Sequence, residues 1–158
     1  MTKFLLAVHV LAAIIAIGPV TVAASMFPPS ARKALAEPKN TQAVSTVRLL
    51  HRICRVYATV GVVVPVFGFA TASNMGVLGD TWLIVSIALT VVAAVVLIAL
   101  VLPRQAAIAE SVWDAGGGEV AVARNATVRL AMFTGIFNLL WATVTILMIV
   151  RPGSSTGA

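Results

Sequence analysis

Four stretches of this chain are apolar for about 20 residues each, which is the length needed to cross the hydrocarbon core of a bilayer. They cover residues 4–26, 55–72, 82–102 and 128–150. Backbone polar groups in lipid must be satisfied within the segment, so each stretch is expected to be a helix. We predict an all-α fold, an integral membrane antiparallel four-helix bundle in one domain over residues 1–158. The second helix should begin outside the lipid, at about residue 41.

The composition leaves little room for any other class of protein. The chain is 60% hydrophobic and only 10% charged, whereas soluble domains are about 25% charged. Its net charge of +6 comes from cations at the ends of apolar runs, so it indicates membrane topology rather than nucleic-acid binding. The single cysteine, Cys54, excludes an internal disulfide and a multi-cysteine metal site.

Prolines and a capping residue set the expected helix ends. The first span resembles a secretory signal peptide, but its apolar run is longer than a usual signal core, so we expect it to be retained. Pro28 and Pro29 are predicted to end the first helix, because proline lacks the amide donor. The third span should run to Leu102, before Pro103, and the Ala-rich residues 105–114 could form a short helix. Thr41 is expected to cap the second helix.

A basic segment at the start of the second span predicts the orientation. At 100° per residue, Arg48, His51, Arg52 and Arg55 share a stripe about 100° wide. Nine of the eleven Lys and Arg residues lie on the two longer connectors and their flanks; only Lys3 and Arg151 lie on the other side. Cytoplasmic loops carry the excess of such cations. We therefore expect both termini outside and two longer cytoplasmic loops, in a multi-pass protein of the bacterial inner (plasma) membrane.

His9 is the only ionisable residue well inside a span. It shares a face with small residues, so it should point into the bundle or towards a partner. It could be a haem ligand, a copper ligand or a proton relay, or a neutral histidine bonded to a neighbouring span. The polar candidates to accept that bond are Ser86, Thr90 and Asn138.

The two histidines are predicted to lie at opposite faces of the membrane. His51 precedes the entry of the second span, whereas His9 lies about 8 Å inside the outer boundary. About 30 Å of hydrocarbon separates the faces, so the pair cannot hold one haem or one ion. No span carries Asp, Glu or Cys at its middle, so we predict no catalytic residues and no metal site.

Other positions are predicted to contact lipid or neighbouring helices. The stripe of Arg48, His51, Arg52 and Arg55 could bind an anionic lipid such as cardiolipin, could bind an acidic partner, or could be a plain positive-inside anchor. Helix packing is predicted at four small or polar positions, with a kink near Pro65; these positions are Gly61, Gly68, Gly135 and Asn138.

An internal repeat is also conceivable at a shift of 81 residues. Residues 7–17 then lie over 88–98, and residues 46–49 lie over 127–130. A true duplication would repeat the first pair of spans as the second pair. Ordinary Ala- and Val-rich membrane composition is the competing explanation.

Residues 4–18, with His9 and Gly18, resemble the first helix of a family of small four-span bacterial membrane proteins of unknown function. The same stretch is similar to the first span of copper-resistance-D and membrane protoporphyrinogen-oxidase-like proteins, which implies haem or copper at His9. The further ligands of those enzymes are missing here. The size and the Ala/Val-rich style also resemble accessory subunits of actinobacterial respiratory supercomplexes, in which cytochrome bcc and an aa3-type oxidase are joined.

Three functions follow as hypotheses. The first is a non-catalytic accessory subunit that packs against other membrane subunits of a larger complex, expected to be respiratory, and that needs no cofactor. The second is a haem- or copper-handling membrane enzyme that uses His9. The third is a small transporter, against which the lack of central charged residues argues.

Overall fold

The computed structural model describes residues 2–113 and 120–153, and every regular element in these ranges is a helix. Four long helical units follow one another along the chain. They are α1 (Thr2–Ala36); α2 (Thr41–Val60) with α3 (Val63–Met75); α4 (Thr81–Val95) with η1 (Val96–Val101) and α5 (Leu102–Trp113); and α6 (Val120–Val150). Each unit contains a helix long and apolar enough to cross a membrane.

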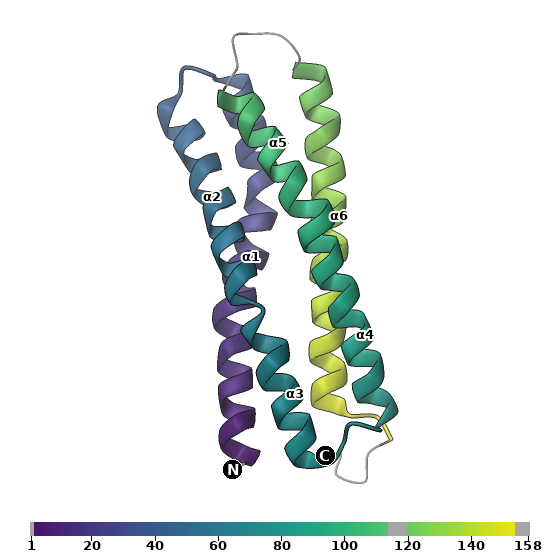
Figure 1. Cartoon of the computed structure of the whole chain (residues 1–158). Helices are drawn as coiled ribbons and strands as arrows, with labels where there is room; N and C mark the ends of the chain where they lie inside the picture. The colour runs from purple at the N-terminus through teal and green to yellow at the C-terminus, as the bar shows by residue number, and fades with distance from the viewer. Residues whose placement is uncertain (1, 114–119, 154–158) are drawn as a thin grey trace.

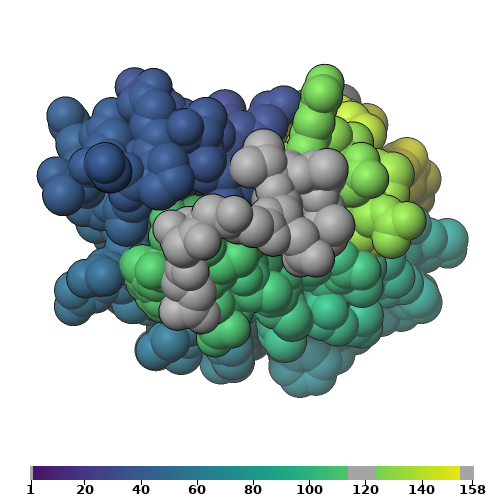
Figure 2. All heavy atoms as spheres, turned by 90° about the horizontal axis from the view of Figure 1, so that it is seen from above, coloured from purple at the N-terminus to yellow at the C-terminus, as the bar shows by residue number. Residues whose placement is uncertain are grey.

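Successive units run antiparallel, and the start of α1 and the end of α6 lie at the same end of the bundle (Figure 1). α1 packs against α2, α3 and α6, and α4 packs against α6. Seen from the opposite end, the helices form one closely packed group (Figure 2). The predicted all-α bundle of four apolar helices is therefore confirmed.

Pro28 and Pro29 do not end the first helix, contrary to the prediction. α1 continues through both prolines to Ala36, so the connection to α2 is only residues 37–40. Proline inside a helix costs about 3 kcal/mol. Beyond the prolines, however, Ala31 and Ala34 are buried in the core, and Phe27 and Pro28 are buried before them. Burial of these additional two turns or so offsets the cost of the lost backbone bonds.

The helix expected after Pro103 is present, and it continues from the third span without a break. Pro103 lies in the first turn of α5, which continues directly from η1, a six-residue stretch of π-helix. A π-helical turn is wider than an α-helical turn and occurs where the regular hydrogen-bond ladder is interrupted. The wide turn before Pro103 leaves room for the proline ring, so the helix from α4 to α5 continues without interruption.

The second unit breaks where the sequence predicts a kink. α2 ends at Val60 and α3 begins at Val63, so the break at Gly61 and Val62 precedes Pro65. Asn40, and not Thr41, caps α2, because its side chain accepts a hydrogen bond from the Ala43 amide at 3.1 Å. At the far end, Gly76 has φ 69° and closes α3 before a short turn into α4.

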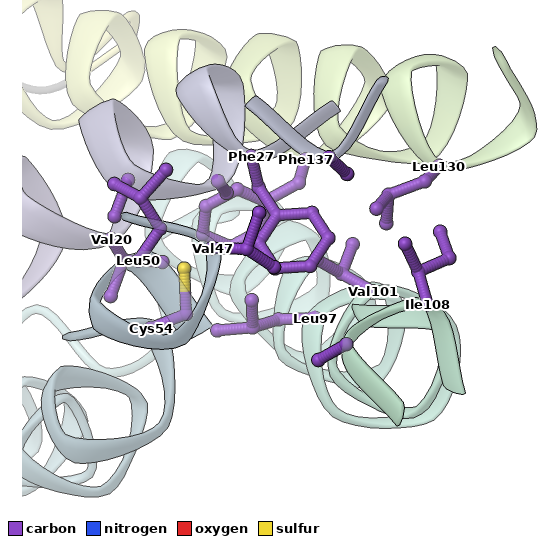
Figure 3. Close-up of a cluster of buried hydrophobic side chains, with 14 of the residues drawn as sticks. Val20, Phe27, Val47, Leu50, Cys54, Leu97, Val101, Ile108, Leu130 and Phe137 are labelled. Carbon is purple, nitrogen blue, oxygen red and sulfur yellow. The ribbon is translucent and has the colours of Figure 1, made fainter. Parts of the chain in front are cut away.

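The buried core is concentrated towards the end of the bundle where α1 ends and α2 begins. It gathers around Phe27 and Phe137, with side chains from α1, α2, the third unit and α6 (Figure 3). At the terminal end, the described residues form a smaller hydrophobic cluster of Ala72, Trp82 and Leu83. α3 packs mainly along α1. Lipid gives no hydrophobic force between helices, so looser packing at this end fits a membrane location.

The possible repeat is matched by burial in one pair of helices but not in the other. At the 81-residue shift, Ala16 and Val20 of α1 fall on Leu97 and Val101 of the third unit, and all four are buried. In α2 and α6 the aligned positions disagree. Leu49 is exposed, whereas Leu130 is fully buried. The duplication therefore stays a prediction.

Candidate functional site

His9 lies on the face of α1 that meets α3, and it is nine-tenths buried. Its Nδ1 lies 2.9 Å from the backbone carbonyl oxygen of Val64. A carbonyl oxygen only accepts, so Nδ1 must carry the proton and donate. The bond crosses between α1 and α3 just after the break in the second unit.

Gly68 makes room for the His9 ring. A Cβ at this position would lie 2.8 Å from His9 Cε1 and 3.2 Å from Nδ1. Such distances are shorter than van der Waals contact, so only glycine lets α1 and α3 approach this closely. Gly68 was predicted to pack against another helix, and the structure places the His9 imidazole at that contact.

None of the three side chains expected to bond to His9 does so. Ser86 donates to the Trp82 carbonyl, and Thr90 donates to the Ser86 carbonyl within their own helix. Asn138 donates to the hydroxyl of Ser25 at 3.0 Å. Sequence patterns could not reveal the true partner, because a backbone carbonyl exists at every position. The sequence feature that could have indicated this contact is the placement of Gly61, Pro65 and Gly68 on one face of the second span.

The geometry of His9 leaves one ring nitrogen available. With Nδ1 protonated, Nε2 keeps its lone pair, and it has no hydrogen-bond partner among the described residues. Metal-bound histidines commonly donate their other N–H to a carbonyl in this way. The described residues contain no group of three or more His, Cys, Asp or Glu side chains that could hold a metal ion. His9 could thus supply a single ligand.

His51 lies far from His9 and has different neighbours. It precedes Val64, the residue that bonds to His9, by 13 residues, roughly 20 Å of helix. Its Nδ1 lies 3.4 Å from Gln105 Oε1, and Gln105 Nε2 donates to Cys54 Sγ at 3.5 Å. Gln105 is fully buried. These side chains connect α2 with α5, a link that the sequence analysis missed.

The basic stripe of α2 is divided between two environments. His51 turns towards α5, whereas Arg52 and Arg55 are exposed. The guanidinium of Arg48 lies 5.0 Å from the ring centroid of Trp113 in α5. Cation–π contacts of this kind are worth about 0.5–1 kcal/mol at exposed sites. His51 therefore leaves the stripe, whereas Arg48, Arg52 and Arg55 stay at the surface.

α6 carries three buried polar atoms without a hydrogen-bond partner among the described residues. They are Thr134 Oγ1, Asn138 Oδ1 and Trp141 Nε1, spaced along one side of the helix. Beside them, a Cβ added at Gly135 would have no atom within 4 Å. The predicted packing position Gly135 therefore borders open space, whereas Asn138 reaches α1 through Ser25.

Length, apolarity and packing define the class of this chain as a multi-pass helical membrane protein. The chain belongs to the family of predicted integral membrane proteins DUF2269, whose model matches residues 3–152. This confirms the expectation of a small four-span membrane protein of an uncharacterised family. Comparisons with curated proteins and with solved structures gave no match.

Proposed function

We propose that this protein is a non-catalytic accessory subunit, which binds other subunits of a larger complex in the bacterial inner membrane. The observation that carries the proposal is a face of α6 that the chain itself leaves uncovered, with open space at Gly135 and an exposed Ala142. Small residues on such a face let a neighbouring helix approach closely. The three unpaired polar atoms of α6 are buried within the bundle, so they do not take part in this contact.

The expected partner element is a transmembrane helix with a polar side chain. Asn138 and Gly135 lie on the side of α6 next to α1, and the exposed Ala142 continues that side one turn further. Small residues let helix backbones approach closely, and a polar side chain can then bond across the contact. One interhelical bond of this kind is worth about 1 kcal/mol in lipid.

The larger complex that we favour is a respiratory one, of the cytochrome bcc–aa3 type. Support for this identity comes from the resemblance in size, span number and composition described for the sequence.

Co-purification tests the accessory role. The tagged protein, extracted in mild detergent from its native membrane, should carry other membrane subunits in a fixed ratio. Gly135→Leu should release them without unfolding the chain, because the space beside Gly135 is open. Ala94→Leu adds the same bulk at an exposed position of α4 and should not release them. Isolation of the wild-type chain alone would contradict the proposal.

A second function is favoured by the His9 geometry. A histidine whose Nδ1 is held by a carbonyl presents Nε2 in a fixed direction, as haem and copper ligands do. A haem- or copper-handling enzyme would need further ligands from another chain. An optical spectrum of the purified protein decides, since a haem band that disappears in His9→Ala would favour this function over the first. A transporter finds no comparable support.

A further inference from the structure

The arginines near the connector end differ in whether other residues of the chain already bind their guanidinium groups. Arg104 donates from Nη1 to the Leu100 carbonyl at 2.9 Å and lies 4.5 Å from the ring centroid of Phe133. Arg52 and Arg55 are exposed, and neither forms an ion pair with a carboxylate in the described part of the chain. Their guanidinium groups are therefore free to bind an external anion.

Arg48 adds a third guanidinium group, one helical turn before Arg52. It lies four residues before Arg52, about 6 Å along the helix, and seven before Arg55, about 10 Å. Its contact with Trp113 holds an otherwise flexible side chain beside the interhelical surface. A guanidinium held in this way loses less conformational freedom when it binds a phosphate, with which it forms paired hydrogen bonds.

Below these arginines, the same helix presents an apolar surface. Val56 and Val60 of α2 and Val63 of α3 are all exposed. Exposed valines next to free cations form an amphipathic surface at the expected boundary between headgroups and hydrocarbon. The charged part suits a phosphate, and the apolar part suits an acyl chain.

We propose that Arg48, Arg52 and Arg55, with Trp113, form a binding site for an anionic phospholipid on the face of α2 that points away from the bundle. The phosphate lies between the guanidinium groups, and one acyl chain follows the exposed valines. An acidic protein would complement the charge but not this apolar continuation, so the lipid is the better match. This site is separate from α6 and does not depend on the accessory role.

Lipid-dependent stabilisation tests the site. The full-length protein in uncharged detergent is titrated with phosphatidylglycerol, and its thermal unfolding is followed. Each arginine near an anionic lipid surface contributes about a fivefold change in affinity, so Arg52→Gln with Arg55→Gln should weaken binding roughly thirtyfold. Arg124→Gln with Arg129→Gln removes two exposed cations from α6 and should leave the affinity nearly unchanged.

Further measurements separate the lipid from other anions. Trp113→Leu should weaken binding by a fewfold, because Arg48 loses its support. Phosphatidylcholine, inorganic phosphate and a polyglutamate peptide should each have little effect. Equal losses in the two double variants would show a delocalised charge effect and overturn the proposal. An equal response to inorganic phosphate or to polyglutamate would overturn the assignment to a lipid.

Discussion

The imidazole of His9 and the backbone carbonyl of Val64 join α1 to α3 through a hydrogen bond of 2.9 Å. The bond lies at the loosely packed end of the bundle, where α3 has α1 as its main neighbour. Because the acceptor is backbone, the side chain at position 64 does not determine the bond. Gly68 does, since the ring occupies the space that any larger residue would need.

Gly68→Ala should destabilise the protein by about 1–3 kcal/mol, as overpacking does elsewhere. The added methyl group would lie 2.8 Å from His9 Cε1, which forces α1 and α3 apart. Unfolding by a denaturing detergent measures the change. Gly135→Ala is the matched control, because its Cβ would meet no atom within 4 Å. Equal losses in both variants would contradict the close contact at Gly68.

His9→Ala should relieve most of the cost of Gly68→Ala. Alone, it removes one interhelical hydrogen bond worth about 1 kcal/mol. In the double variant, the methyl group at position 68 occupies space vacated by the ring, so the two costs should not add. A double-mutant cycle on the same unfolding assay measures the coupling. Additive costs would mean that the two residues do not touch.

Cys54 should resist alkylation in the folded protein. Its side chain is fully buried in the core and accepts a hydrogen bond from Gln105 Nε2. Since Cys54 is the only cysteine, labelling of the whole chain with N-ethylmaleimide reports on it directly. We expect labelling to be at least tenfold slower than in Ser73→Cys, whose position is exposed. Similar rates would place Cys54 at the surface.

Cysteine labelling also tests the predicted orientation. In a Cys54→Ala background, Gly79→Cys should react with a membrane-impermeant maleimide in intact cells. Lys39→Cys should react only after the membrane is opened, because the cation-rich connectors are expected in the cytoplasm. Both positions are exposed, so accessibility within the fold does not distinguish them. The reverse pattern would invert the topology.

Hydropathy and charge predicted the four helices, their order and the kink near Pro65, because these depend on local composition and on the length of a bilayer crossing. The helix end at Pro28 and Pro29 was predicted wrongly. Proline weakens a helix by a fixed local cost, but the burial that offsets it comes from residues distant in sequence. Ala31 and Ala34, for example, are buried in a core shared with α2 and α5.

The candidate sites show a similar limit. His9 was identified by its rarity within an apolar span, yet its partner is a backbone carbonyl that no sequence pattern marks. The basic stripe on α2 was visible from helical periodicity. The contacts that Arg48 and His51 make were not predictable. Their partners, Trp113 and Gln105, come from a helix more than 50 residues later in the chain.

Photo-crosslinking in native membranes tests the accessory role most directly. A photoreactive residue is placed at Ala142, an exposed position of α6 one helical turn beyond Asn138, and separately at Ile84, an exposed position of α4. The account predicts that Ala142 crosslinks to one membrane protein in high yield, whereas Ile84 yields only lipid adducts. Lipid adducts alone from Ala142, at the same level as from Ile84, would contradict it.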